Sequence, residues 1–401
     1  MKTLLSKIDW TVYYNPNEVY ELAQKLVQIP SHKDVPTRER DVALFIKTYC
    51  EQNGLQAKLS VVEGERYNVY ITLKGNDSGK TLLFNGHTDT VPPYEMTVPP
   101  FEGMIKEGYL WGRGCNDMKG ALAAMITAML AIKRSDYKLK GDIILAAVVG
   151  EEEQSDGTEQ LVLEGIKADG AIVGEPSNYE YAIGHRGLEW LEFEFIGKAA
   201  HGGVPKEGIN AISMASKFIE AVERDLMPQI ELRTNAYMGP SVMNFGKITG
   251  GTQPSTVADQ CFLQIDRRYV TGETVISVMR EYQEIIDQLK AEIPEFQCEM
   301  KRMPSNMMKQ FDHMYHYTSP EEAIVKSVEK VLESHLTEKA MITRKRGWTD
   351  AATLSYYGKI PTVITGPGDI KDSHTKAEKI SLKSLNDYVV LYAEIALDFL
   401  K

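Results

Sequence analysis

The sequence predicts an α/β protein in which a smaller α/β domain is inserted into a larger one. Its 401 residues exceed the ~250–300 at which a single hydrophobic core usually stops growing. The segment Asp142–Val149 is a nearly continuous apolar run between two glycines, as in a strand buried on both faces of a helix-covered sheet. After Gly187 the pattern changes, because Leu188–Phe195 places glutamates among apolar residues in the alternation of a half-exposed strand.

The elements of the larger domain follow from the spacing of apolar residues and from the turn residues between them. Helical spacing predicts helices over 37–53 and 119–133, with Thr37 as the N-cap of the first and Gly54 as its stop. Short β-like runs predict strands at 68–73, 81–84, 142–149 and 171–173.

The inserted domain is predicted from two strand-helix-strand passages. These are a strand at 188–195 with a helix at 210–224, strands near 243–248 and 256–268, and a helix at 273–291. From about Pro304 the alternation of the larger domain resumes. We therefore expect a first part of the larger domain at 1–187, the insertion at 188–303 and the second part at 304–401.

Composition excludes several classes of protein. A hydrophobic content of 43% and a charged content of 25% are typical of globular proteins. The formal net charge of −11 argues against a nucleic-acid surface, which needs a basic patch. The four cysteines form no C-x-x-C pair, so reduced thiols in a cytoplasm are expected. No apolar run reaches the ~20 residues that span a bilayer, and no secretory signal is seen, so we expect a cytoplasmic protein without membrane contact.

Candidate chemistry begins at the end of the strand at 81–84. His87 and Asp89 are two residues apart, so their side chains point the same way on an extended chain. A metal-binding imidazole usually gives its other N–H to a carboxylate, which Asp89 could supply. Alone, this H-x-D pattern is more typical of a hydrogen-bonded turn than of a metal site.

Two further segments place carboxylates at turns. Asp117 stands in a glycine-rich stretch before the apolar helix, where it could be an N-cap. The glycines around it instead indicate a tightly bent or closely approached backbone, as ion sites often need. Glu151, Glu152 and Glu153 follow the most buried-looking strand, where adjacent carboxylates repel unless a cation is near. A solvated acidic loop is the alternative for that cluster.

Glu175 ends another short apolar strand, and His374 precedes the last helix. Each is unremarkable alone. Together with His87, Asp117 and a carboxylate of the cluster Glu151–Glu153, they form a set of nitrogen and oxygen ligands that suits zinc, with manganese or cobalt as alternatives.

With these segments in order, the sequence resembles a family of zinc deacylases and exopeptidases. The family includes acetylornithine deacetylase, succinyl-diaminopimelate desuccinylase, aminoacylase and bacterial glutamate carboxypeptidase. The matching segments cover nearly the whole chain: GHTDTVP, WGRGCNDMKG, VGEEE, VGEPS, GKAAHGGVPKEGINAI, GKITGGTQPS, QIDRRYVTGET, GWTDAATLSYYGKIPTVITGPG and SHTKAE. The resemblance implies a zinc-exopeptidase-like catalytic domain with a mixed sheet, and an inserted domain that serves as lid and dimer interface.

The resemblance also implies a metal site with two Zn2+ ions per chain, for which Co2+ or Mn2+ could substitute. Asp117 would bridge the two ions, with His87 and Glu175 on one ion and Glu152 and His374 on the other. In the same comparison Glu151 would be the general base and Asp89 the partner of His87. Such a site could activate a water and polarise an amide carbonyl.

Substrate contacts are implied mainly in the insertion. His201 would reach the partner subunit's active site and stabilise the oxyanion. Arg268 would hold a substrate carboxylate with its planar fork, and Arg186 lies where relatives carry an arginine near the lid hinge. Ser255 stands where relatives usually carry a substrate-binding Asn.

Other departures from the family pattern bear on the base and on specificity. Gly150 replaces a common Asp before the glutamates, and Gly202 and Gly203 replace small hydroxyl residues. Trp348 lies in a stretch that is normally small and glycine-rich.

The expected function is therefore hydrolysis of the amide bond of an N-acyl amino acid by a dimeric enzyme, of deacetylase or desuccinylase type. Metal-activated water would attack the amide with Glu151 as base. A dipeptidase or carboxypeptidase with the same metal site is the alternative enzyme. A metal-binding protein without catalysis and an interaction scaffold are the non-enzyme alternatives, and an intact Glu151 argues against a pure binder.

Overall fold

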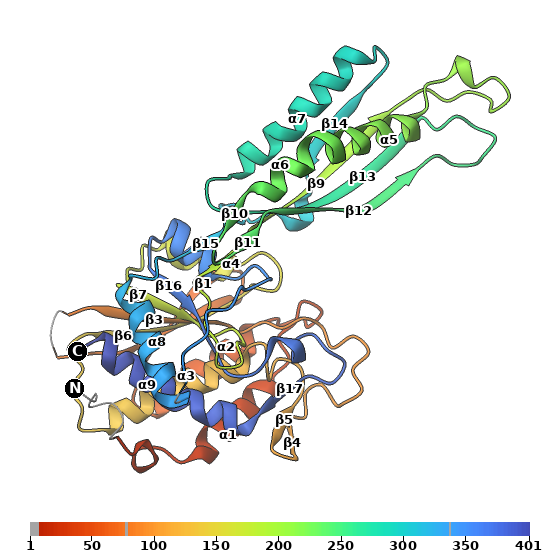
Figure 1. Ribbon diagram of the computed structural model, residues 1–401. Coiled ribbons are helices and arrows are strands. Elements are labelled where there is room, and N and C mark those ends of the chain that lie inside the picture. Colours follow the sequence, from red (N-terminus) through yellow and green to blue (C-terminus); the bar gives the residue numbers. More distant parts are fainter. Residues whose placement is uncertain (1–7, 77–78, 337) are drawn as a thin grey trace. The chain divides into compact units, whose positions relative to one another are not determined.

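The computed structural model describes residues 8–76, 79–336 and 338–401, and its chain forms two compact units (Figure 1). One unit holds the residues up to Ile183 together with Tyr317–Thr343 and Thr349–Lys401. The other holds Gly184–His316 and a short second segment, Arg344–Trp348. The sequence pattern does not indicate that this short segment joins the insertion.

A six-stranded mixed sheet forms the centre of the first unit. Its order is β1 (Gln56–Glu63), β2 (Arg66–Leu73), β6 (Asp142–Val148), β3 (Thr81–His87), β7 (Gly170–Val173) and β16 (Thr362–Ile364). The last four of these strands are parallel, and β1 and β2 are antiparallel to their neighbours. The buried apolar strand predicted at 142–149 is thus β6, inside the sheet.

Helices cover both faces of this sheet. They are α1 (Pro16–Val27), α2 (Arg40–Gln52), α3 (Lys119–Arg134), α4 (Asp156–Leu163), α8 (Ala323–Leu336) and α9 (Leu382–Phe399). Neighbouring side chains of β3 show the two faces, because they alternate along a strand. Leu83 lies in the core cluster that contains Leu161 of α4, whereas Phe84 packs on Tyr392 of α9 with ring centroids 5.4 Å apart.

Helix α2 begins later than its sequence predicts. It starts at Arg40, and its cap residue Glu39 makes no side-chain cap. Glu39 is buried and accepts hydrogen bonds from Arg66 at 2.7 and 2.8 Å instead. Thr37 therefore lies in a turn and caps nothing, while Gly54 follows the helix end with a φ of +76°. The start was wrong because a long-range ion pair fixes Glu39.

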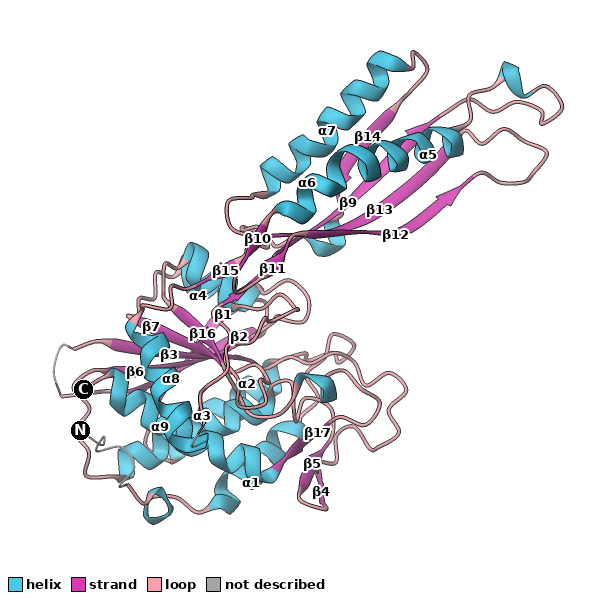
Figure 2. Cartoon of the chain, in the orientation of Figure 1, coloured by secondary structure: helices cyan, strands magenta, loops and turns pink. Residues whose placement is uncertain are grey.

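The second unit is a four-stranded antiparallel sheet with helices on one face (Figure 2). The strand order is β12 (Val242–Gly250), β13 (Gln260–Tyr269), β9 (Gly187–Ile196) and β14 (Cys298–Arg302), and the helices are α5 (Ala211–Ala221), α6 (Met227–Leu232) and α7 (Val275–Glu292). Phe193 of β9 packs on Phe218 of α5 at 4.7 Å, whereas its neighbour Glu192 is half-buried and hydrogen-bonds Gln264. The alternation predicted after Gly187 is therefore that of a one-sided sheet.

Shorter elements complete the chain. A three-stranded sheet consists of β17 (Lys379–Ser381), β5 (Tyr109–Trp111) and β4 (Met104–Lys106), and the remaining short strands are β8 (Gly184–His185), β10 (Thr234–Asn235), β11 (Gly239–Pro240) and β15 (His316–Tyr317). Single 3-10 or π-helical turns lie at Trp10–Val12, Pro205–Glu207, Val222–Leu226, Pro304–Asn306, Thr353–Tyr357 and Ile370–Asp372. The π turn at Val222–Leu226 joins α5 to α6, and the helix predicted at 210–224 ends within this turn.

The four cysteines are buried and free. Among the described residues, none of the helices has both the length and the apolar character that crossing a bilayer requires. The fold class predicted from the sequence, an α/β domain with a mixed sheet and a smaller inserted α/β domain, is confirmed.

Candidate metal centre

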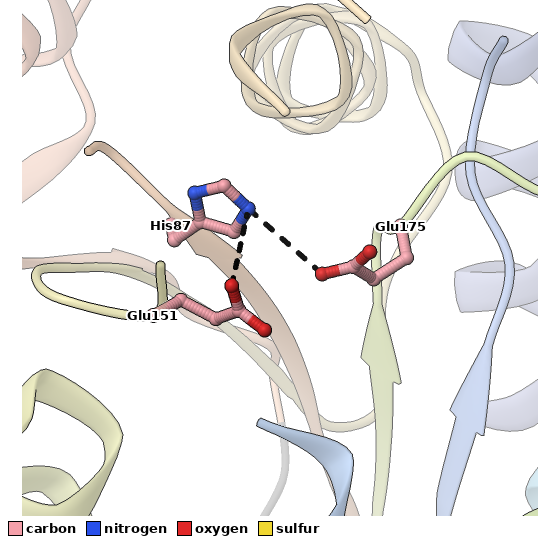
Figure 3. Close-up of side chains that lie close together, drawn as sticks. All are labelled: His87, Glu151 and Glu175. Atoms are coloured by element: carbon pink, nitrogen blue, oxygen red, sulfur yellow. Dashed lines mark ion pairs between the residues drawn. The ribbon is translucent and has the colours of Figure 1, made fainter. Parts of the chain in front are cut away.

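The parallel strands bring three candidate residues to one edge of the sheet. His87 ends β3 and pairs with Val148, so the turn with Glu151 starts beside it. Glu175 follows β7, the other neighbour of β3. The His87 Nε2 atom lies 3.9 Å from Glu151 Oε2 and 3.8 Å from Glu175 Oε1 (Figure 3).

Asp117 lies between two histidines. Its Oδ1 atom is 3.2 Å from His87 Nε2, and its Oδ2 atom is 3.4 Å from His374 Nε2. His374 Nε2 is also 3.0 Å from Glu152 Oε1. The structure thus brings together all five residues that the sequence proposes as ligands, with the carboxylate of Asp117 between the two imidazoles.

Asp117 is not the cap of helix α3. That helix begins at Lys119, and the cap position belongs to Met118, which makes no side-chain cap. The glycines before Asp117 meet a crowded backbone, as their density predicts. A Cβ on Gly114, whose φ is +82°, would lie 2.5 Å from Thr90 Cγ2.

Asp89 contacts His87 through its backbone as well as its side chain. The His87 Nδ1–H donates to the Asp89 main-chain oxygen at 3.0 Å, and the Asp89 carboxylate is 3.6 Å from the same nitrogen. The carboxylate accepts the N–H groups of Glu151 at 3.2 Å and Glu152 at 3.0 Å. Asp89 therefore fixes the imidazole tautomer, with Nε2 free to bind an ion, and holds the glutamate turn.

The electrostatics of the cluster call for a cation. Burial, with the nearby Glu175 carboxylate, raises the pKa of Glu151 well above its usual range. Burial also raises the pKa of Asp89 to about 7 and that of Asp350 to about 6. So many carboxylates are stable in a buried site when a positive ion compensates them. Imidazole nitrogens and carboxylate oxygens are the donors that zinc and similar divalent metals take, so the residues fit such ions.

Two buried carboxylates at this site escaped the sequence reasoning. Glu378 accepts N–H groups from the loop that carries Asp117, and it belongs to the SHTKAE segment that gave the resemblance. Asp350 accepts a hydrogen bond from Thr158 Oγ1 at 2.7 Å and belongs to the GWTD segment. The contacts of these side chains are long-range, so only the fold reveals them.

The other proposed site residues belong to the second unit. His201 is exposed, and its Nδ1 accepts the Gly203 N–H at 3.0 Å. Ser255 is exposed, and its main-chain oxygen accepts the Gly202 N–H at 2.7 Å. Within this unit, both residues therefore accept hydrogen bonds from main-chain N–H groups of the segment Gly202–Gly203.

The two arginines of the second unit differ in their partners. Arg268 Nε donates to both oxygens of Asp266, at 2.8 and 3.1 Å. Arg186 Nη1 donates to the Pro240 oxygen at 3.1 Å, while its buried Nε has no hydrogen-bond partner among the described residues. Burial and the neighbouring charge of Arg268 lower the pKa of Arg186.

Comparison with known proteins identifies the family. The sequence model of peptidase family M20/M25/M40 matches residues 83–398. The chain belongs to this family. The resemblance noted from the motifs is thus confirmed, and the chain is a metal-dependent hydrolase of a family of deacylases and peptidases.

Similar proteins cover the M20 chain almost completely. An N-formyl-4-amino-5-aminomethyl-2-methylpyrimidine deformylase of Halalkalibacterium halodurans is 28% identical over 97% of this chain and 95% of its own. An acetylornithine deacetylase of Proteus mirabilis is 29% identical over 90% and 92%. A probable succinyl-diaminopimelate desuccinylase of Staphylococcus epidermidis is 25% identical over 96% and 98%.

Solved structures share the fold of this M20 chain. An aminopeptidase of Bacillus cereus superimposes with a TM-score of 0.80 at 21% identity, covering 97% of this chain and 100% of its own. A tripeptidase of Staphylococcus aureus gives a TM-score of 0.78 at 25% identity, with 96% and 98% covered.

Proposed function

We propose that this M20 enzyme hydrolyses the amide bond of an N-acyl amino acid, as a deacetylase or desuccinylase does. The observation that supports this most is the position of Asp117, whose two oxygens face different histidines. We propose two Zn2+ ions per chain, replaceable by Co2+ or Mn2+. His87 and Glu175 would complete one site around Asp117, and Glu152 and His374 would complete the other.

The chemistry divides between the ions and the side chains. A metal pair of this kind supplies Lewis acidity, which polarises a carbonyl and lowers the pKa of water toward ~7. Glu151 is the general base in this proposal. Its carboxylate takes the proton of the attacking water and returns it to the leaving amine, a task for which a raised carboxyl pKa is suited. Asp89 keeps His87 in the required tautomer and holds the Glu151 N–H.

The second unit supplies substrate contacts in this proposal. Arg268, oriented by Asp266, binds a substrate carboxylate in a forked pair. Arg186, whose buried Nε lacks a partner among the described residues, is the second candidate for that role, and Ser255 is the third. The enzyme acts as a homodimer in which His201 of each chain stabilises the oxyanion in its partner's site.

A second candidate function is cleavage of short peptides with the same metal site. The likeness to a tripeptidase at 25% identity favours it. The likeness to deacylases of three kinds, including a deformylase, favours acyl cleavage. The two functions differ in what lies on the acyl side of the amide bond, and not in the metal site.

A substrate panel separates these functions. N-formyl, N-acetyl and N-succinyl derivatives of the same amino acids, the formylated aminomethylpyrimidine and simple di- and tripeptides would be assayed with and without a chelator. We expect chelator-sensitive cleavage of acylated substrates. Cleavage of peptides alone would replace the deacylase proposal with the peptidase, and cleavage of the pyrimidine alone would show that the amine is not an amino acid.

A further inference from the structure

A buried carboxylate lies behind the loop that carries Asp117. Glu378 is 0% exposed, and its Oε1 atom accepts three main-chain N–H groups, from Gly114 at 3.0 Å, Asn116 at 3.0 Å and Asp117 at 3.2 Å. Its Oε2 atom accepts from Nη1 of Arg113, a guanidinium that is itself 1% exposed. One side chain thus fixes the backbone of the loop at three points.

Only a carboxylate satisfies all these donors. The three N–H groups and the Arg113 guanidinium all need acceptors, and a carboxylate offers acceptors on both oxygens. Glutamine offers one oxygen and one NH2 group. Whichever way it turned, its NH2 group would face either the N–H groups or the guanidinium, and one set of buried donors would be left unpaired.

The same contacts tie the Asp117 loop to the segment that carries His374. Strands β5 and β17 pair directly before and after these loops, with Trp111 opposite Lys379. The Gly112 N–H donates to the Glu378 main-chain oxygen at 3.1 Å. Asn116 Nδ2 donates to the Asp369 oxygen and to Ser373 Oγ, both at 2.9 Å.

Arg113 closes this connection from the other side. Its Nη2 donates to the main-chain oxygen of Thr375 at 3.4 Å, directly after His374. The Asp117 loop and the His374 loop are therefore joined through one buried ion pair and its neighbours, which we call the Glu378 clasp (Arg113, Asn116 and Glu378).

We propose that Glu378 and Arg113 are positioning residues that set the separation of Asp117 and His374 and thereby the affinity for one of the two metal ions. This inference rests on the proposed metal centre. The ion proposed between Asp117, Glu152 and His374 depends on the clasp for two of its ligands. The other ion shares only Asp117 with the clasp, because His87 and Glu175 are held by β3 and β7 of the parallel sheet.

The consequence is that the two sites respond unequally when the clasp is broken. Partners behind metal ligands typically contribute about 10–100-fold to affinity or activity. A change at Glu378 should therefore lower the affinity for one ion by that factor and the affinity for the other by a smaller factor, since one of its three ligands is affected. A defect of folding alone would lower the affinity for both ions together.

The test is a zinc titration of metal-free Glu378→Gln against a competing chelator, beside the unaltered chain. The matched control is Glu273→Gln in the second unit. Glu273 is also a buried carboxylate, and it accepts from Arg267, Arg233, Ser241 and the Val270 N–H. It has no proposed role in metal binding, so its loss affects folding alone.

We expect two ions per chain for the unaltered protein and the control. In Glu378→Gln, one dissociation constant should rise about 10–100-fold while the other changes by a smaller factor. Two unchanged constants, or two constants raised equally, would overturn the inference. Failure of the unaltered chain to bind two ions would contradict the proposed metal centre instead.

Asn116→Ala keeps the test available if Glu378→Gln does not fold. It removes the two Nδ2 hydrogen bonds to the His374 segment without removing a buried charge. The affinity for the same single ion should fall, by a smaller factor than in Glu378→Gln. If circular dichroism shows this variant to be folded, two dissociation constants that are unchanged from the unaltered chain, or raised equally, would also overturn the inference.

Discussion

Asp117 faces His374 with one carboxylate oxygen, at 3.4 Å from the imidazole Nε2, and turns its other oxygen to a second histidine. Residues far apart in the sequence are thus brought to within 3.4 Å of one carboxylate. The following predictions test what this arrangement does.

Substitutions of the two residues should differ in metal content. Asp117→Asn removes the charge shared by both proposed ions, so both should be lost on dialysis against a weak chelator. His374→Ala removes a ligand of one ion, so about one zinc per chain should remain, since affinity depends on ligand number. Metal analysis of the dialysed proteins measures this. His335→Ala, a half-buried histidine paired with Asp387, is the control and should keep both ions.

Replacement of the general base should separate binding from turnover. Glu151→Gln should lower kcat by about 10²–10⁴-fold, the usual contribution of general acid–base catalysis, while metal content stays near that of the unaltered chain. Its neighbour offers a control, because Glu153 is exposed and pairs with Arg38. Glu153→Gln should keep activity within about twofold. High activity in Glu151→Gln would show that another group is the base.

Gly150 should tolerate no side chain. Its φ is +79°, and a Cβ there would overlap Asp156 Oδ1. Gly165 has a φ of +73°, and a Cβ there would have no atom within 4 Å. Gly165→Ala should therefore cost only the backbone strain, about 1–2 kcal/mol. Gly150→Ala should cost at least about twice as much and should also lower kcat, because the clash moves Glu151. Urea unfolding and kinetics measure both. Equal losses of stability in the two variants would contradict the crowding of Gly150 by Asp156.

The second unit should lose stability in mild acid through His313. Burial, with the nearby Arg302 charge, lowers the pKa of His313 to about 4. The folded state therefore binds fewer protons than the unfolded state between pH ~6.5 and ~4. The stability that the neutral, buried His313 allows is fully present above pH ~6.5 and is lost as the pH falls toward ~4. The free energy of unfolding should fall by about 3 kcal/mol over this pH range.

His313→Phe should flatten that part of the pH profile. The imidazole packs edge-on against Trp348 at 4.6 Å, and phenylalanine keeps a ring there without a titrating group. The free energy of unfolding, measured by urea between pH 4 and 7, should fall less steeply for the variant. Parallel profiles for the two proteins would show that His313 does not contribute.

The sequence predicts elements well where a periodic pattern extends over many residues. The run at 142–149 became β6, the apolar stretch at 119–133 became α3, and the alternation at 188–195 became β9. The candidate ligands could be proposed because segments that are each unremarkable alone together supply a set of histidines and carboxylates and resemble one family in the right order. Parallel pairing, which no short segment reveals, is what brings His87, Glu175 and the Glu151 turn together.

What the sequence does not predict depends on long-range contacts. Helix α2 starts later than predicted because Arg66 binds Glu39. Arg66 lies on strand β2, and no local sequence pattern reveals that it pairs with Glu39. Glu378 carries no local sign of its role, since its donors come from the Asp117 loop. The residues 344–348 join the second unit although the surrounding chain belongs to the first.

The measurement that tests the central claim most directly is metal content per chain, paired with hydrolysis of N-acetyl, N-succinyl and N-formyl amino acids before and after chelation. We expect about two zinc ions per chain, given a cluster of this ligand set, and cleavage that stops on chelation and returns with zinc. Full cleavage after the ions have been removed would contradict the account, as would a purified chain that binds no divalent metal.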